Sequence, residues 1–301
     1  MESYPIDAPD RASFKHCRRA WDLGARARRN FEAATPPAPP TVVEGVMEAL
    51  AVYYFPGMWD WNRAIVLPLV HRALDRAASA GPEVHAVLDR YAAWAAPLDR
   101  FTPVRVAADL EVNVPDPFIS DRDVATEAGA PVRYTARADA VVWTEEDQLE
   151  LLCHRVGPFT DPELLSLDEG ALTTCWAWAH LMLDDRIAMI AFNEICLDDA
   201  TFRRTHVPVS RKEVALAGRQ LGVESLDMLD NGRSVYPNPT PAGCAACAFR
   251  HPCRAMREGE DPEPILSAEF RQRAEPVLQE GRLGGQTWSM NRGARPQRFN
   301  D

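Results

Sequence analysis

The alternation of apolar and polar residues predicts helices over the first third of the chain. Residues 12–33 have a helical composition and end at the proline-rich linker TPPAPP, residues 35–40, because proline cannot continue a helix. Residues 42–54, VVEGVMEALAVYY, repeat apolar side chains at helical spacing and are predicted to form a buried helix. Its apolar face consists of Val43, Val46, Met47, Leu50 and Tyr54. Residues 57–101 are predicted to be helical throughout, as a subdomain with its own small core.

After Pro103 the pattern changes to the two-residue period of β-strands. Strands are predicted at 104–114, 132–143, 148–156, 187–197 and about 201–209. Residues 168–184 are predicted to form a helix that Asp168 or a neighbour caps. Ser210 with Glu213 three positions later matches a capping box, so another helix is expected to begin there. The tail is predicted to be partly helical over 267–280.

The length of 301 residues suits one large core with an insertion. The pattern divides the chain into five regions, each with its own character. These are a basic N-terminal helix with its linker (1–40), a buried helix with a helical insertion (41–102), an α/β core (103–235), a three-cysteine motif (236–257) and a polar tail (258–301).

The composition is that of a soluble globular protein, with 46% hydrophobic and 26% charged residues, and it excludes a disordered or fibrous class. No stretch approaches the roughly 20 uninterrupted apolar residues of a membrane span. The first residues, MESYPIDAPD, lack the basic and then apolar pattern of a signal peptide. We therefore expect a cytoplasmic protein that is not associated with a membrane.

The charge distribution is uneven. A net charge of −11 argues against indiscriminate binding of nucleic acid, unless basic residues gather on one face. The stretch from Arg11 to Arg29, here called the basic segment, has seven cations against the single Asp22, and further arginines surround the C-terminal cysteines. If these two groups converge, they form a positive surface. The candidate nucleic-acid contacts are Arg18, Arg19, Arg250 and Arg254, although a solvated amphipathic helix explains each arginine equally well.

Three of the seven cysteines lie close together near the end of the chain, in the stretch PTPAGCAACAFRHPCRAM. Cys244, Cys247 and Cys253 have the spacing C-x2-C-x5-C and need a fourth ligand to complete a tetrahedral zinc site or to hold a four-iron cluster. The cysteines at 153, 175 and 196 fall inside predicted strands or a buried helix, where a lone cysteine behaves as a small apolar residue.

Cys17 is the predicted fourth ligand, because it lies in a basic amphipathic helix with no need for a small core side chain. Joining it to the C-terminal cysteines would tie together two ends of the chain more than 220 residues apart, and metal affinity would then stabilise the fold. Zinc sites usually have two C-x2-4-C pairs, and only one is present here. A 4Fe–4S cluster is therefore the first prediction and zinc the alternative.

The order of these parts resembles the iron–sulfur RecB-like nucleases of the PD-(D/E)XK superfamily, which include CRISPR-associated RecB-like exonucleases and the AddB nuclease domain. The resemblance covers about residues 12–257 and rests on the SxxxCxRxW-like helix, the strand hairpin with an aspartate, and the C-x2-C-x5-C motif after Pro-Asn-Pro. It implies an α/β (α+β) fold with a restriction-endonuclease-like core, a mixed sheet flanked by helices, a helical insertion and a C-terminal iron–sulfur clasp.

The resemblance also implies where a nuclease site would lie. Asp139, in TARADAVV, matches the first acidic metal ligand of the family. In the family, a stretch like VVDYKTG contains a metal-binding acid and a lysine two residues later. This chain has LLCHRVG in the same place, so Cys153 occupies the position of the acid and Arg155 that of the lysine. Met47 stands at or next to the place of the family's metal-binding histidine. Thr174 and Trp178 stand where the family often has glutamine and tyrosine.

These substitutions predict a degenerate site. A thiol is a poor ligand for Mg²⁺ and an arginine is too basic to lose a proton, so Mg²⁺ or Mn²⁺ is not expected to bind. Asp139 is equally well explained as a surface or capping residue, and Arg155 by an ion pair with Asp139 or another acid. A migrated carboxylate could replace the missing one: Glu150 points away from Cys153 and Glu48 lies one position off the expected helix face, which leaves Glu111.

Three functions follow from these observations. The first is a catalytically inactive nuclease fold that keeps an iron–sulfur cluster and binds DNA, RNA or a protein partner. The second is an active metal-dependent DNA exonuclease with an unusual site. The third is a cluster-dependent redox sensor or protein-interaction module that does not bind nucleic acid, which the acidic net charge favours.

Overall fold

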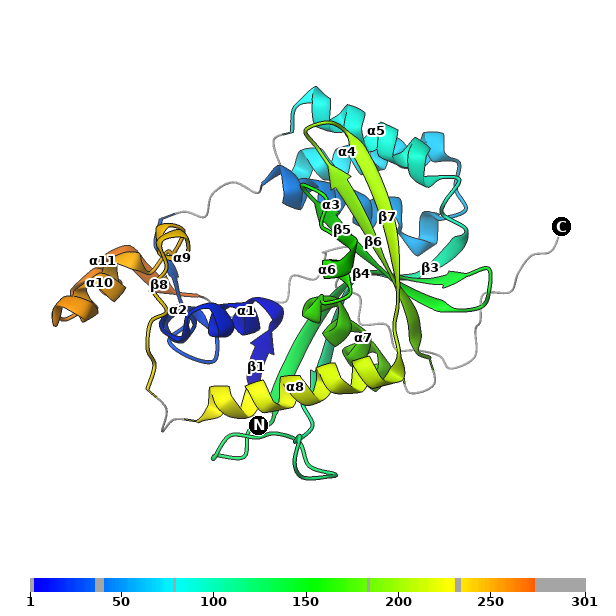
Figure 1. Ribbon diagram of the computed structural model, residues 1–301. Helices are drawn as coiled ribbons and strands as arrows, with labels where there is room; N and C mark the ends of the chain where they lie inside the picture. Colours follow the sequence, from blue (N-terminus) through cyan, green and yellow to red (C-terminus); the bar gives the residue numbers. More distant parts are fainter. Residues whose placement is uncertain (1–2, 36–40, 78–79, 183–184, 231–233, 274–301) are drawn as a thin grey trace.

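The structure is a computed structural model that describes residues 3–35, 41–77, 80–182, 185–230 and 234–273. A six-stranded mixed sheet forms its centre (Figure 1). Its strands are β1 (Tyr4–Asp7), β3 (Phe101–Asn113), β4 (Val132–Thr144), β5 (Leu149–Val156), β6 (Ile187–Cys196) and β7 (Thr201–Pro208). The predicted strands are all present, and the fold class, a mixed sheet flanked by helices, is confirmed.

Strand β4 is the central strand of the sheet. The long antiparallel partner β3 runs along one edge of β4. The other edge pairs with β5 over Ala140–Trp143 and, further toward the start of β4, with β1 in parallel over Val132–Thr135. Strand β6 then pairs in parallel with β5, and β7 pairs antiparallel with β6. Residues 136–139 of β4 therefore lie at a fork, where the pairing with β5 has ended and that with β1 has not begun.

Helices cover both faces of the sheet and form two separate cores with it (Figure 1). The first face is covered by α1 (Ala8–His16), α7 (Glu169–Leu181) and α8 (Arg211–Leu229). The second is covered by α3 (Val42–Tyr53), α4 (Arg63–Ala77) and α5 (Pro82–Ala95), with the short η1 (Pro56–Met58). Alternation along the strands fills both cores, so Val141 and Leu151 face the first and Ala140 and Leu152 face the second.

The predicted helix starts agree with the structure. Asp168 caps α7 by accepting the backbone N–H of Ala171 at 2.7 Å, and Ser210 with Glu213 forms the capping box of α8. In α3 the buried face is shifted from the predicted one, because Val43 is 43% exposed while Ala49 and Tyr53 are buried. No helix in the described ranges combines the length and apolarity that crossing a membrane requires.

The prediction of one helix over residues 12–33 is wrong. Helix α1 ends at His16, Cys17 has an extended backbone with φ −158° and ψ 108°, and α2 spans Arg18–Gly24. The backbone of Cys17 ends one helix and begins the next, since its N–H donates to Ser13 and its carbonyl accepts from Trp21. Beyond α2 the chain forms the strand β2 (Phe31–Ala33), which pairs with residues 270–272. A pattern of neighbouring residues cannot predict a partner so distant in the sequence.

The C-terminal part of the described chain packs on α2 and β2 as a small unit with its own core. It contains α9 (Pro241–Ala245), α10 (Arg250–Glu258), α11 (Glu263–Glu269) and β8 (Phe270–Gln272). The core of this unit consists of Leu23, Phe249, Leu266 and Phe270. The helix predicted over 267–280 is wrong at 270–272, because these residues pair antiparallel with β2, and its part beyond 273 lies outside the described residues. Helix α6 (Pro162–Leu165) completes the elements.

Candidate functional site

The structure places Cys17 near Cys247 and near the segment that leads to the C-terminal cysteines. The backbone N–H of Asn238 donates to Cys17 Sγ at 3.4 Å, and Asn238 also donates from Nδ2 to the His16 carbonyl at 2.9 Å. Arg19, two residues after Cys17, donates from Nη1 to Cys253 Sγ at 3.7 Å. The segment that precedes the cysteine motif and the turn between α1 and α2 are thus joined by direct contacts. We call Cys17, Cys244, Cys247 and Cys253 the four-cysteine site.

Three of the thiols act electrostatically on the fourth, Cys247. Burial raises the pKa of the Cys247 thiol, and the nearby thiols of Cys17, Cys253 and Cys244 raise that pKa further. All seven cysteines are free of disulfides. In the described ranges, however, no three His, Cys, Asp or Glu side chains are close enough together, as placed, to hold a metal ion. The site therefore fits a thiolate-bound metal centre in ligand type and in chain topology, and binding requires the thiols to move closer together.

Packing around the four-cysteine site is independent of any metal. A side chain at Gly243 would begin 2.5 Å from His16 Nε2, so glycine allows α9 to approach the end of α1. The rings of Phe249 and Phe270 stack at 5.0 Å between centroids, and a Cβ at Gly24 would meet the Phe249 ring at 3.0 Å. These contacts hold the N-terminal and C-terminal segments together and position the four thiols.

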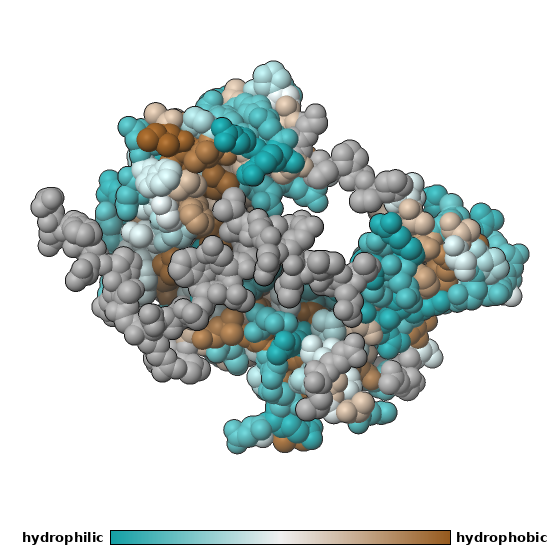
Figure 2. Space-filling model, turned by 180° about the vertical axis from the view of Figure 1, so that it is seen from behind, coloured by the Kyte–Doolittle hydropathy of each residue, from teal (hydrophilic) through white to brown (hydrophobic). Residues whose placement is uncertain are grey.

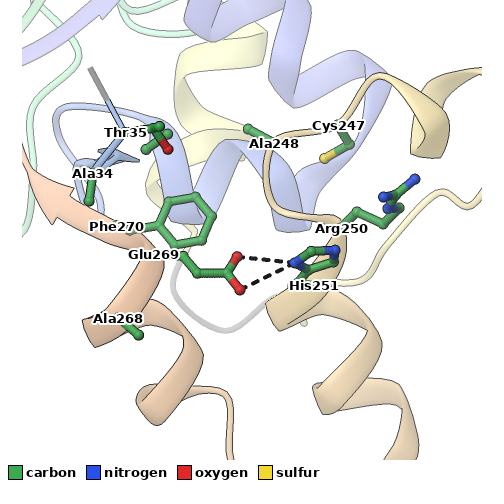
Figure 3. A pocket seen from close by; sticks show the side chains of 10 residues that line it. Ala34, Thr35, Cys247, Ala248, Arg250, His251, Ala268, Glu269 and Phe270 are labelled. Carbon is green, nitrogen blue, oxygen red and sulfur yellow. Dashed lines mark hydrogen bonds and ion pairs between the residues drawn. The ribbon is translucent and has the colours of Figure 1, made fainter. Parts of the chain in front are cut away.

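A cavity of about 410 Å³ opens beside the four-cysteine site (Figure 3). It is lined by Ala33, Ala34, Thr35, Cys247, Ala248, Arg250, His251, Ala268, Glu269 and Phe270. Figure 3 shows Arg250 and Cys247 on the same side of this cavity and the ion pair between His251 Nδ1 and Glu269 Oε2, at 3.1 Å. The lobe that contains this cavity mixes hydrophilic and apolar residues on its surface (Figure 2). The cavity leaves one side of the Cys247 region open to solvent.

The basic segment is largely neutralised by acids. Arg11 is buried and donates to Glu224 at 2.7 Å, and Arg18 pairs with Asp227 at 2.6 Å while its guanidinium lies over the Phe14 ring. The other pairs of the segment are Lys15 with Glu224, Arg28 with Asp22, and Arg29 with Glu263. These ion pairs neutralise much of the positive charge that the sequence suggested was available for binding nucleic acid.

The four candidate nucleic-acid contacts therefore differ from one another. Arg18 is held by Asp227, and Arg254 pairs with Glu258 at 2.8 Å one helical turn away. Arg19 donates a hydrogen bond to the sulfur of Cys253, and Arg250 lines the cavity beside the four-cysteine site. Within the ranges that the structure describes, neither Arg19 nor Arg250 has a carboxylate partner. These two are the arginines of the set that remain available near the four-cysteine site.

Asp139 lies at the fork of the sheet, and its carboxylate completes the β4–β5 ladder. The ladder ends at the pair Ala140 and Leu152, and Asp139 Oδ2 accepts the backbone N–H of His154 at 2.8 Å. On the other edge, Ala107 of β3 has φ +48° and interrupts the pairing opposite Asp139. At the fork, the backbone N–H of His154 has no carbonyl of β4 as its acceptor, and the side-chain oxygen of Asp139 takes that place. Asp139 therefore has a structural role.

A cavity of about 40 Å³ adjoins Asp139, and we call it the small cavity. Its lining is Met47, Glu48, Ala51, Ala107, Arg137, Asp139 and His154. Space of this size holds water molecules and is far too small for a nucleotide. Glu48 was expected to lie one position off the helix face of the ligand, but it lines the small cavity together with Met47 and with Ala51, one turn further along α3.

The remaining carboxylate candidates lie elsewhere. Glu111 pairs with Arg133 at 3.3 Å on an exposed part of the sheet and does not line the small cavity, so it is not the replacement ligand that the sequence favoured. Glu150 is buried beside His206 at 3.3 Å and faces away from Cys153, as predicted. Burial raises the pKa of Glu150 to about 7.

Cys153 and Arg155, at the substituted positions, have structural partners. Burial raises the pKa of the Cys153 thiol well above its ordinary value, and Asp139 adds to the effect. Arg155 pairs with Asp168, the cap of α7, and its guanidinium lies 5.0 Å from the Phe192 ring centre. The predicted ion pair of Arg155 therefore exists, with Asp168 as the partner and not Asp139. Thr174 and Trp178 are buried in the core on α7.

A buried polar network next to the small cavity was not predicted from the sequence. Arg204 of β7 donates from Nε to Asn193 Oδ1 at 2.5 Å and from Nη2 to Asp99 Oδ1 at 2.7 Å. Asn193 in turn lies 3.4 Å from His154 Nδ1, and Tyr54 stacks on the His154 ring at 5.2 Å. Burial lowers the pKa of His154 to about 3, so the ring is neutral. The network joins the sheet to the helical insertion through residues that are far apart in sequence.

Asp139→Asn is expected to change the pH dependence of stability without removing the contact with His154. Burial raises the pKa of Asp139 to about 6, from an ordinary value of 3.8. Between these values the folded protein keeps a proton that the unfolded chain has lost, so the wild type loses stability relative to the Asn variant as pH rises through this window. Urea unfolding at about pH 4 and about pH 7 measures the difference.

Asp139→Ala is the matched comparison. It leaves the backbone N–H of His154 without its acceptor and is expected to destabilise the fold by about 1–3 kcal/mol relative to Asp139→Asn. Equal stabilities of the two variants, at both pH values, would show that the contact with His154 contributes nothing.

No family model matches this chain, and no curated protein matches it either. Among solved structures, the chain is similar to the crystal structure of SSO0001, with 13% sequence identity. The alignment covers 73% of this chain and 88% of the other, with a TM-score of 0.35. Similarity at this level supports no argument about function.

Proposed function

We propose that this chain is a nuclease-fold protein of the iron–sulfur RecB-like type, within the PD-(D/E)XK superfamily, that binds a 4Fe–4S cluster and has lost cleavage activity. In this proposal it binds nucleic acid or a protein partner. The observation that supports it most strongly is the position of Cys17, which lies beside Asn238 and the C-terminal cysteines although more than 220 residues separate them in the sequence.

The four-cysteine site would hold the cluster through its four thiolates, and zinc is the alternative occupant. The cluster, when bound, would supply a redox-active and strongly cross-linking centre. The chain's own contribution is the donation of Asn238 N–H to Cys17 Sγ and of Arg19 to Cys253 Sγ. Such hydrogen bonds orient the ligands and stabilise their negative charge.

The loss of cleavage is argued from the residues around Asp139. Arg155 is engaged by Asp168, and the thiol of Cys153 is kept protonated by burial, so neither supplies a second oxygen ligand. Asp139 itself accepts from His154 in the sheet. Glu48 is the one further carboxylate that lines the small cavity. Two carboxylates beside a water-sized space are a weak basis for phosphodiester hydrolysis.

The test begins with protein purified without oxygen. We expect a brown colour with visible charge-transfer absorbance and about four iron and four sulfide per chain. We also expect no cleavage of single-stranded or double-stranded DNA in Mg²⁺ or Mn²⁺ above the level of Asp139→Ala. Zinc alone would remove the main support for the family assignment. Cleavage that Asp139→Ala abolishes would instead identify an active exonuclease.

Reversing the charge of Arg19 and Arg250 together is expected to weaken binding of a labelled oligonucleotide by about tenfold or more and to lower its salt dependence. Both arginines lie at the four-cysteine site without a carboxylate partner in the described chain. Arg122→Glu is the matched control, since Arg122 pairs with Asp116 in the loop after β3. Fluorescence anisotropy at two salt concentrations measures the effect, and an equal loss in the control would contradict it.

A second candidate function is a cluster-dependent sensor or protein-interaction module without nucleic acid. The ion pairs of Arg18, Arg28 and Arg29 favour it, because they neutralise the basic segment. Wild-type protein with an intact cluster that shows no salt-dependent binding to DNA or RNA would support this candidate and exclude nucleic-acid binding as the role of the first.

A further inference from the structure

Two histidines of the helical insertion face each other across α4 and α5. His71 Nδ1 lies 2.7 Å from His85 Nδ1. On the far side of each ring, His71 Nε2 lies 2.8 Å from Asp89 Oδ1, and His85 Nε2 lies 3.0 Å from Asp75 Oδ1. We call His71 and His85 the histidine pair. It lies outside both the four-cysteine site and the small cavity.

The arrangement has a local twofold symmetry that the sequence already contains. Helix α4 has HRALD at 71–75 and α5 has HAVLD at 85–89, so each helix repeats a histidine and an aspartate at positions i and i+4. Residues so spaced lie on one face of a helix. Each aspartate pairs with the histidine of the other helix, so the four side chains form one row: Asp89, His71, His85, Asp75.

Counting the protons in this row shows that it needs a cation at its centre. Each carboxylate accepts a hydrogen bond from Nε2 of its histidine, so both Nε2 atoms bear a proton. A neutral imidazole has one proton, which leaves a lone pair on each Nδ1. Two lone pairs 2.7 Å apart repel each other, unless a positively charged species lies between them. A shared proton satisfies this requirement, and so does a metal ion.

We propose that the histidine pair is a binding site for a divalent transition metal of the Zn²⁺ class, which displaces the shared proton. Imidazole nitrogen is a preferred ligand of such ions, and a carboxylate on the far ring nitrogen is the usual outer partner of a metal-bound histidine. For tetrahedral Zn²⁺, ligand bonds of about 2.0–2.1 Å place two nitrogens about 3.3 Å apart, so the rings need only separate slightly.

The surroundings fit a metal that keeps water ligands. The side chains of His71 and His85 are 23% and 25% exposed, so both rings are partly accessible to solvent. The chain provides two nitrogens there, and in the described ranges no third metal-binding side chain joins them, so water would complete the coordination. An ion held in this way exchanges with solvent, unlike one enclosed by four protein ligands. Val70, Leu74 and Leu88 pack the two helices independently of the histidines.

Calorimetric titration with Zn²⁺ tests the proposal on full-length protein whose four-cysteine site is already loaded, so that thiols do not compete. We expect the wild type to bind one Zn²⁺ more than His71→Ala or His85→Ala. His180→Ala is the matched control, because His180 contacts Trp176 on α7 and is expected to leave the stoichiometry unchanged. Asp75→Asn and Asp89→Asn are expected to weaken Zn²⁺ binding about 10-fold or more.

The asparagine variants keep both rings and give an independent reading if an alanine variant does not fold. Equal Zn²⁺ stoichiometry and affinity in the wild type and the histidine variants would overturn the proposal. Unchanged affinity in both asparagine variants, or a wild type that binds only the proton, would overturn it as well.

Discussion

Replacing Cys17 with serine is expected to abolish cluster binding and to destabilise the whole protein. Serine keeps the size of the side chain but removes the thiolate, so a four-iron cluster loses one of its four protein ligands. The three remaining cysteines lie within ten residues of one another and close no long loop. Metal affinity that joins residues 17 and 244 contributes directly to folding, and its loss is expected to cost at least about 3 kcal/mol.

Iron and sulfide analysis, visible absorbance and thermal unfolding measure this effect. At about 2–4 °C for each kcal/mol, we expect the melting temperature to fall by about 6–12 °C. Cys196→Ser is the matched control, because Cys196 lies at the end of β6 in the central sheet, where it pairs with Thr201. It should keep the iron. Full iron content in Cys17→Ser would show that the fourth ligand lies elsewhere, and the proposed topology of the site would then be wrong.

Arg204→Met is expected to destabilise the fold by about 3–5 kcal/mol, the usual cost of removing one partner of a buried ion pair. The side chains of Arg204 and Asp99 are 5% and 1% exposed, so Asp99 has no access to solvent. Without Arg204, Asp99 still accepts hydrogen bonds from the hydroxyls of Tyr53 and Tyr54, each at 3.4 Å. Asn193 loses a donor at the same time.

The pH dependence of Arg204→Met follows from the same contacts. Burial raises the pKa of Asp99, and Arg204 opposes this effect. Removing Arg204 therefore raises that pKa further. When the pKa of a carboxyl is higher in the folded than in the unfolded state, the protein loses stability as pH rises between the two values. The stability lost in Arg204→Met should therefore be larger at neutral pH than in mild acid.

Two further variants separate the ion pair from general disruption. Asp99→Asn combined with Arg204→Met leaves no buried charge and should recover part of the loss. Arg254→Ala breaks the exposed pair with Glu258 and should cost no more than about 0.5 kcal/mol. Urea unfolding measures all of them. Similar losses in the Arg204 and Arg254 variants would contradict the buried role of Arg204.

The two cores explain why the network around Arg204 has a large expected effect. The insertion contacts the sheet through Tyr54, Tyr91 and Leu152, in a core distinct from that under α7 and α8. The hydroxyls of Tyr54 and Tyr91 are 2.7 Å apart, and Arg204 joins them to Asp99. A polar group in such a core is costly when unpaired, so the network fixes how the insertion sits on the sheet.

Part of the candidate site could be predicted from residue chemistry. The C-x2-C-x5-C spacing predicted that three thiols belong to one site, and the unusual setting of Cys17 predicted the fourth. The position of Asp139 at the fork, and the pairing of Arg155 with Asp168, depend on which strand ends where. Helical spacing alone argued against Glu48 as a replacement ligand. The rotation of α3 relative to the sheet nevertheless places Glu48 at the small cavity.

The sequence by itself determined most of the elements of the sheet and its helices, because their signals are local: the apolar period, the caps at Asp168 and Ser210, and the strand hairpin of β4 and β5. Tertiary structure alone decided the break at Cys17, the pairing of β2 with β8, the network of Arg204 and the histidine pair. Each joins residues that are distant in the chain or on different helices. Their energy comes from burial and pairing between elements, and the periodicity of a single element contains no information about its partner.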